Sequence, residues 1–121
     1  MKILVVEDNP MNLELMTDLL EFEGLQVVTA TSGEEGVKQA AEHLPDLILM
    51  DVSLPGMDGL EATRVIRAQA ATAHIPVVAV TAHAGEADRE NVTAAGCAGY
   101  LTKPIDVATF VGDVTRYAGA S

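Results

Sequence analysis

Five short runs dominated by apolar residues recur along this 121-residue chain, and they constrain its fold more than any other feature. They are residues 2–6, 25–30, 47–50, 75–80 and 99–102. Their apolar residues do not alternate with polar ones, which is typical of strands buried on both faces of a parallel sheet. Segments with helical periodicity separate the runs. The chain is therefore predicted to form an α/β domain with five parallel strands and helices on both faces of the sheet.

Ordinary start and stop signals bound the first two expected helices. Asn9 and Pro10 indicate an N-cap followed by proline at the first helical position, and Gly24 ends that helix. The adjacent Thr31 and Ser32 supply a capping hydroxyl for the second helix, which Pro45 ends.

Three more helices are expected at about residues 58–70, 85–95 and 106–119. Residues 85–95 contain one large apolar side chain, Val92, so this helix is expected to be held weakly against the sheet. In the other four helices the side chains expected to face the core are Leu15, Met16, Leu19, Leu20 and Phe22; Val37, Ala40, Ala41 and Leu44; Ala62, Val65 and Ile66; and Val107, Phe110, Val111 and Val114.

Composition and charge limit the classes of function. With nearly half of its residues apolar, the chain fits one domain over residues 1–121. A net charge of −11 without a basic cluster would repel phosphate backbones and anionic lipids, so no nucleic-acid or membrane binding is expected. The N-terminus does not resemble a signal peptide, and the single cysteine, Cys97, excludes an internal disulfide. We expect a cytoplasmic protein whose partners are proteins or small ions.

Charged and hydroxyl side chains stand at the ends of four expected strands. Glu7 and Asp8 follow the first run, Asp51 ends the third, Thr81 follows the fourth and Lys103 follows the fifth. Ligands of open parallel sheets bind outside the carboxyl ends of the strands. These five side chains are therefore expected to converge on one crevice.

Converging carboxylates repel one another, by about 4 kcal/mol for two charges ~4 Å apart at an effective dielectric of about 20. Lys103 or a hard divalent cation would compensate for this repulsion. Oxygen ligands of this kind suit Mg²⁺ and leave positions open for phosphate oxygens. With Thr81 as a hydrogen-bond donor, the set of residues fits transfer of a phosphoryl group to Asp51.

Five motifs in order together resemble the receiver domain of two-component response regulators, over essentially the whole chain. They are Glu7-Asp8, Asp51, Leu54-Pro55-Gly56-Met57-Asp58-Gly59, Thr81-Ala82 and Lys103-Pro104. The resemblance implies a flavodoxin-like sheet of order 2-1-3-4-5. It also implies a phosphorelay response regulator that a histidine kinase or a histidine phosphotransfer protein phosphorylates and that then switches its binding to an effector protein.

The resemblance also implies a set of site residues. Asp51 would be the phosphorylated residue, and Mg²⁺ would be bound by Asp8, Asp51 and the main-chain carbonyl of Ser53. Glu7 would act in the outer shell through water. Family members more often carry aspartate where this chain has Glu7.

Further residues would stabilise the phosphoryl group and switch the protein. Thr81, followed by Ala82, and Tyr100 resemble the switch pair, whose movement reshapes the face formed by the fourth helix, fifth strand and fifth helix. Lys103 resembles the phosphate-contacting lysine, and its bond to Pro104 resembles one that the family usually holds in cis. Ser53 and His83 occupy variable positions that affect the lifetime of the phosphorylated state, which the sequence leaves open.

The sequence is compatible with more than one kind of protein. The chain resembles stand-alone regulators of the cell-cycle DivK type and also receivers of hybrid histidine kinases. A phosphohydrolase of the haloacid dehalogenase type is disfavoured, since Ser53 stands where that class places a second acid, so the chain is not expected to be an enzyme beyond its own phosphorylation and slow dephosphorylation. Taken alone, Asp51 would more often be a strand-ending cap, Lys103 a solvated lysine and Tyr100 a half-buried aromatic. Only their combination favours function.

Overall fold

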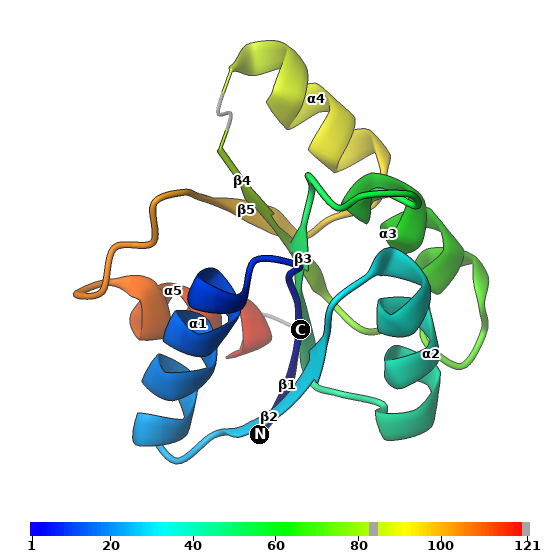
Figure 1. Ribbon diagram of the computed structural model, residues 1–121. Coiled ribbons are helices and arrows are strands. Elements are labelled where there is room, and N and C mark those ends of the chain that lie inside the picture. Colours follow the sequence, from blue (N-terminus) through cyan, green and yellow to red (C-terminus); the bar gives the residue numbers. More distant parts are fainter. Residues whose placement is uncertain (83–84, 120–121) are drawn as a thin grey trace.

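The computed structural model describes residues 1–82 and 85–119, in which five strands form a single sheet (Figure 1). The strands are β1 (Lys2–Val6), β2 (Gln26–Ala30), β3 (Leu47–Asp51), β4 (Val77–Thr81) and β5 (Gly99–Thr102). Their order is β2-β1-β3-β4-β5, and every neighbouring pair is parallel. The predicted α/β fold and the strand order implied by the resemblance are confirmed.

Helices cover both faces of this sheet. They are α1 (Pro10–Phe22), α2 (Gly33–His43), α3 (Gly59–Ala68), α4 (Glu86–Ala94) and α5 (Phe110–Gly119). The first and last pack on one face, α2 and α3 pack on the other, and α4 lies beside the edge strand β5 (Figure 1). Within the described residues, no helix has both the length and the apolar character that crossing a bilayer requires.

Alternate residues of each inner strand belong to different hydrophobic clusters, which explains why the apolar runs are continuous. In β1, Ile3 and Val5 join the cluster formed with α1 and α5. Leu4 and Val6 join the cluster formed with α2 and α3. Because successive side chains of a strand point to opposite faces, a sheet covered twice needs apolar residues at every position.

Two predicted helix caps form as the sequence indicates. The Asn9 side-chain oxygen accepts hydrogen bonds from the amides of Met11 and Asn12 at 2.9 and 3.1 Å. The Ser32 hydroxyl accepts one from the Glu35 amide at 3.1 Å. These contacts fix where the chain leaves β1 and β2 and turns into a helix.

Three large side chains predicted to face the core are instead exposed, Phe22 by 88%, Leu44 by 53% and Val107 by 59%. Phe22 is the last residue of α1 and lies beyond its last buried residue. Leu44 adopts the left-handed conformation at the C-cap, with φ 46°, which takes its side chain off the helical stripe. Val107 precedes α5 in a turn, where the Asp106 side chain accepts a hydrogen bond from the Ala108 amide at 3.0 Å.

The face through which α2 packs was predicted in part, because Ala40 is buried and Val37 packs against the same cluster. Gly33, Gly36 and Ala40 are buried, whereas Ala41 is exposed. A Cβ atom on Gly36 would lie 2.9 Å from a methyl group of Val6, so the helix approaches β1 closely because this position has no side chain. An apolar periodicity does not detect a contact made by glycine.

Helix boundaries and packing differ along the rest of the chain. The observed α3 ends at Ala68 and α5 begins at Phe110, so both are shorter than predicted. Val92 is the single buried residue of α4, as predicted. The N-cap of this helix is Gly85, which offers no side-chain hydrogen bond. The helix beside β5 is therefore held by little apolar contact.

Candidate functional site

Three carboxylates meet at the carboxyl ends of β1 and β3, which are neighbours in the sheet. One oxygen atom each of Glu7, Asp8 and Asp51 lies within 4.8 Å of the others. Glu7 and Asp51 are buried, and Asp8 is exposed. The cluster therefore opens to solvent on the Asp8 side. Its all-oxygen donor set suits a hard divalent cation such as Mg²⁺.

Lys103 supplies a positive charge to the buried part of this cluster. Its Nζ atom lies 2.9 Å from Glu7 Oε1 and 3.3 Å from Asp51 Oδ2. The Lys103 amide donates to the carbonyl of Thr81 at 2.8 Å, so the end of β4 fixes the backbone that carries the lysine. The bond to Pro104 is cis, as the resemblance implied.

The backbone around Asp51 is held from several sides. The Ser53 amide donates to Asp51 Oδ1 at 3.0 Å, and the Val52 amide donates to the Val80 carbonyl at 3.0 Å. A Cβ atom on Gly59 would collide with the Asp51 carbonyl oxygen. The start of α3 can thus lie against the end of β3 because residue 59 is glycine. These contacts leave the Asp51 carboxyl group in one defined place.

Burial and contacts shift the pKa values of the two buried carboxyl groups in opposite directions. Burial, followed by a hydrogen bond with Asp51, raises the pKa of Glu7 to about 7. Burial also opposes ionisation of Asp51, but hydrogen bonds with Glu7 and the Ser53 amide, together with the Lys103 charge, hold its pKa below the usual range. Burial by itself would lower the pKa of Lys103, but the contacts with Glu7 and Asp51 outweigh it, so this pKa is raised. When the pair holds one proton, these directions place it on Glu7 and leave Asp51 ionised.

The residues predicted to form the switch lie on β4 and β5 or directly after β4. Thr81 is buried at the end of β4, one strand from Asp51, and Ala82 follows it at the surface. Tyr100 is half-buried on β5. Ser53 is exposed beside Asp51. His83 lies outside the described residues.

Three contributions to the site had not been predicted. The Asn9 amide donates to Glu7 Oε2 at 3.2 Å, which orients that carboxyl group. Gly59 allows the close approach described above, and its place in a turn-forming motif was the only available signal. The Arg89 guanidinium lies over the Tyr100 ring, 5.4 Å from its centroid, and no sequence pattern pairs these two residues.

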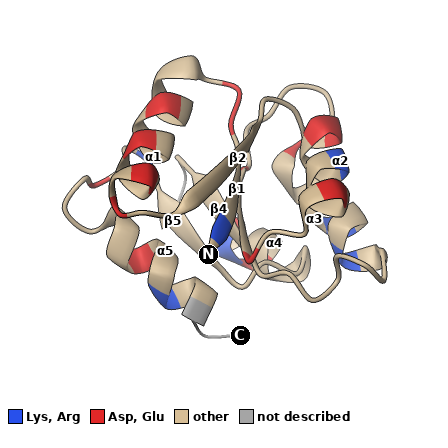
Figure 2. Ribbon diagram, turned by 90° about the horizontal axis from the view of Figure 1, so that it is seen from below, with Lys and Arg blue, Asp and Glu red and all other residues tan. Residues whose placement is uncertain are grey.

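Charge is distributed unevenly over the helices around this site. Acidic residues are spread along α1 and α2 (Figure 2). The first of these helices contains no lysine or arginine. Within the described part of the chain, Lys103 is the only basic residue that pairs with the carboxylate cluster.

Sequence comparisons identify close similarity to one family. A model described as the response regulator receiver domain matches residues 3–115. The polar-differentiation response regulator DivK of Brucella ovis is 43% identical over 117 residues, which cover 97% of this chain and 95% of that relative. The protein of the same name from Brucella anthropi is 42% identical over the same shares.

Solved structures give the same result. A receiver domain of a sensor histidine kinase from Pseudomonas aeruginosa, with a magnesium ion coordinated in its active-site cleft, has a TM-score of 0.89 and 41% identity. The match covers 98% of this chain and 97% of that one. The Vibrio cholerae chemotaxis protein CheY4 has a TM-score of 0.91 and 28% identity, with 96% and 97% covered.

Proposed function

Because this chain belongs to the response regulator receiver domain family, we propose that it is a phosphorelay switch that accepts one phosphoryl group on Asp51. The observation that carries the proposal is the meeting of Glu7, Asp8 and Asp51 with the ammonium group of Lys103. Burying such charges contributes little to folding stability, because the loss of hydration offsets their mutual attraction. Function accounts for the cluster better than stability does.

The proposed reaction moves a phosphoryl group from a phosphohistidine, or from a small phosphodonor, to Asp51. One carboxylate oxygen of Asp51 forms a bond to phosphorus while the bond between phosphorus and the donor atom breaks, and its electron pair leaves with the donor. No general base is needed, because the lowered pKa keeps Asp51 ionised at neutral pH. Lys103, already 3.3 Å from Asp51, would pair with the charge of the transferred group.

The donor atoms at this edge fit Mg²⁺, which would supply positive charge to the phosphoryl oxygens when bound. Asp8, Asp51 and the main-chain carbonyl of Ser53 would hold it, with Glu7 in the outer shell through water. The exposed side chain of Asp8 gives solvent and ions access to the cluster. Because its pKa is raised, Glu7 would have to lose its proton more often than Asp51 to bind the ion directly, which favours contact through water.

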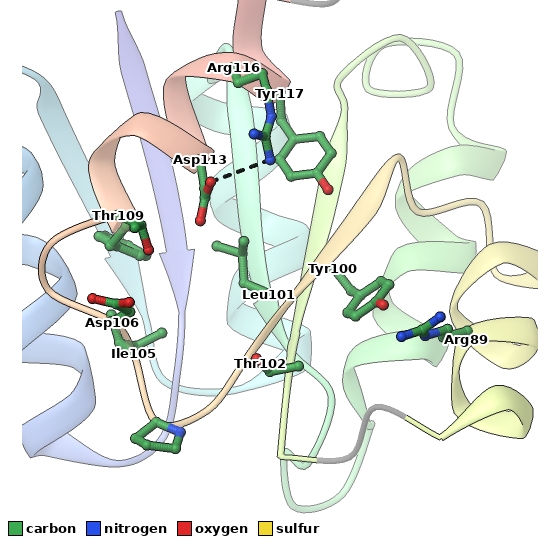
Figure 3. Close-up of a pocket in the computed structure, with 12 residues that line it drawn as sticks. Arg89, Tyr100, Leu101, Thr102, Ile105, Asp106, Thr109, Asp113, Arg116 and Tyr117 are labelled. Carbon is green, nitrogen blue, oxygen red and sulfur yellow. Dashed lines mark ion pairs between the residues drawn. The ribbon is translucent and has the colours of Figure 1, made fainter.

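The switch is proposed to run from Thr81 to Tyr100. Thr81, with Ala82 beside it, would hydrogen-bond the phosphoryl group, and the ring of Tyr100 would then move inward. The surface that changes would be formed by α4, β5 and α5, which surround a cavity of about 560 Å³ (Figure 3). An effector protein would bind this face.

The phosphodonor is proposed to be a histidine kinase or a histidine phosphotransfer protein, both located in the cytoplasm with this chain. Neither nucleic acid nor membrane is a proposed partner. The protein is proposed not to be an enzyme that turns over a separate substrate, since the exposed Ser53 stands where a phosphohydrolase would carry its second acid.

Incubation with acetyl phosphate and Mg²⁺ tests the proposal. Intact-mass measurement should show the gain of one phosphoryl group in the original protein and none in Asp51→Asn. Asp58→Asn is a matched control, because Asp58 caps α3 through a 2.9 Å contact and asparagine caps equally well. Equal uptake by Asp51→Asn and the original protein would remove Asp51 from its role.

A further inference from the structure

The Arg89 side chain of α4 reaches across to the ring of Tyr100 on β5, at the wall of the cavity between α4 and α5 (Figure 3). Its guanidinium carbon lies 5.4 Å from the ring centroid, within the range of a cation–π contact. Acidic residues neighbour Arg89 on the same helix, yet none of the described carboxylates lies within ion-pair distance of it. The ring is therefore the partner of this guanidinium.

Tyr100 lies on the face of the sheet that also carries Thr81. In the register of the two parallel strands, Tyr100 is paired with Ala79 and Thr102 with Thr81. Leu101, between them, packs with the α1 and α5 cluster on the opposite face. The residue next to the ring on β4 is thus Ala79, which is buried. Its side chain is a single methyl group, so it is a small neighbour for the Tyr100 ring.

The contact also ties a weakly packed helix to this ring. Val92 is the only buried residue of α4, and the N-terminus of the helix has no side-chain cap. A single contact therefore contributes a larger share of the free energy that holds α4 against the sheet than the same contact would contribute in α1 or α3.

We propose that Arg89 is a positioning residue that holds the half-buried Tyr100 ring beside α4 and so favours the unphosphorylated conformation. This inference rests on the proposed function, because it concerns the switch that phosphorylation of Asp51 drives. Inward movement of the ring must break the contact with Arg89. Exposed cation–π contacts correspond to about a two- to fivefold change in an equilibrium constant. Removing Arg89 should bias the protein by that factor toward the activated conformation.

The same cavity provides a matched control. The Arg116 guanidinium carbon lies 5.5 Å from the Tyr117 ring centroid, so the chemistry of the contact is the same. Both residues belong to α5, and Arg116 also pairs with Asp113 at 3.3 Å. The Tyr117 ring packs closely over Gly99 instead of standing beside Ala79. Arg116→Ala should therefore leave Tyr100 where it is.

The experiment uses ¹⁹F NMR of protein labelled with 3-fluorotyrosine, which gives two signals because the chain has two tyrosines. The variant Tyr117→Phe assigns them. Spectra are recorded without a phosphodonor and then with Mg²⁺ and beryllofluoride, a mimic of the phosphoryl group. Unphosphorylated Arg89→Ala should shift the Tyr100 signal toward its activated position, and Arg89→Lys should restore it, because lysine also forms cation–π contacts.

Affinity for beryllofluoride with Mg²⁺ gives a second readout. Arg89→Ala should bind about two- to fivefold more tightly than the original protein, while Arg89→Lys and Arg116→Ala should bind as the original does. An unchanged Tyr100 signal and unchanged affinity in Arg89→Ala, while the original protein responds to beryllofluoride, would overturn the role of Arg89 and leave the phosphorelay function intact. Failure of the original protein itself to respond would overturn the proposed function and this inference together.

Discussion

The carboxylate cluster and the α4–β5 edge lie along the same sheet, yet they are packed differently. Asp51 ends a strand whose five residues are all buried, and its carboxyl group contacts the Ser53 amide and Lys103. By contrast, α4 buries only Val92, and β5 contains no fully buried residue. A site that must hold one geometry is built into the densest part of the fold, whereas the surface proposed to change belongs to a part that small energies can move.

Core truncations in the two regions should separate them most strongly. Leu49→Ala in β3 is expected to lower the free energy of unfolding by about 2–5 kcal/mol, because it leaves a cavity in a fully buried strand. Val92→Ala in α4 should cost about 1–2 kcal/mol, since it removes two methyl groups from a helix that can readjust. Urea unfolding monitored by circular dichroism measures both values. Equal costs would contradict the contrast in packing.

The buried proton of Glu7 should give the cluster a pH dependence that the α4–β5 edge lacks. The folded protein keeps this proton up to about pH 7, whereas the unfolded chain loses it near the ordinary pKa of 4.5. Its contribution to stability is therefore complete below pH 4.5 and is lost as the pH rises toward 7, by up to about 3 kcal/mol.

Glu7→Gln keeps the shape of the side chain without the titrating proton. In chelator-treated protein, the stability of the original relative to Glu7→Gln should fall as the pH rises from 4.5 to 7 and then level off. Thermal denaturation at several pH values measures this difference. A difference that stays constant from pH 5 to pH 8 would show that Glu7 is already ionised in the folded protein.

Substitution of glycine should show how tightly the end of β3 is enclosed. Gly59→Ala is expected to cost about 1–3 kcal/mol of stability, because its methyl group would meet the Asp51 carbonyl. Gly112→Ala, within α5, has open space around it and should gain about 0.5–1 kcal/mol from helix propensity. Chemical denaturation of both variants provides the comparison. A neutral Gly59→Ala would mean that the loop after Asp51 readjusts freely.

The same contrast explains what the sequence could predict. Continuous apolar runs and acids at strand ends are local patterns, so the five strands and the positions of Glu7, Asp8 and Asp51 followed from them. Contacts made by backbone or by glycine leave no apolar signal, which is why the packing of Gly36 on Val6 was missed. The pairing of Arg89 with Tyr100 joins an exposed side chain of a helix to a half-buried one of a strand, and no periodicity encodes such a contact.

Phosphorylation is expected to link the two regions through Thr81, and this effect should be the smallest. One hydrogen bond contributes about 0.5–1.5 kcal/mol, so Thr81→Ala should still accept a phosphoryl group but lose most of the resulting change at α4. Thr102→Ala is the matched control, because Thr102 is paired with Thr81 in the sheet register and is exposed. Hydrogen exchange of the α4 amides with and without beryllofluoride and Mg²⁺ measures the response. An undiminished response in Thr81→Ala would mean that the signal reaches α4 by another route. If the α4 amides exchange as slowly as those of β3, the two regions do not differ in local stability, and the contrast between them is wrong.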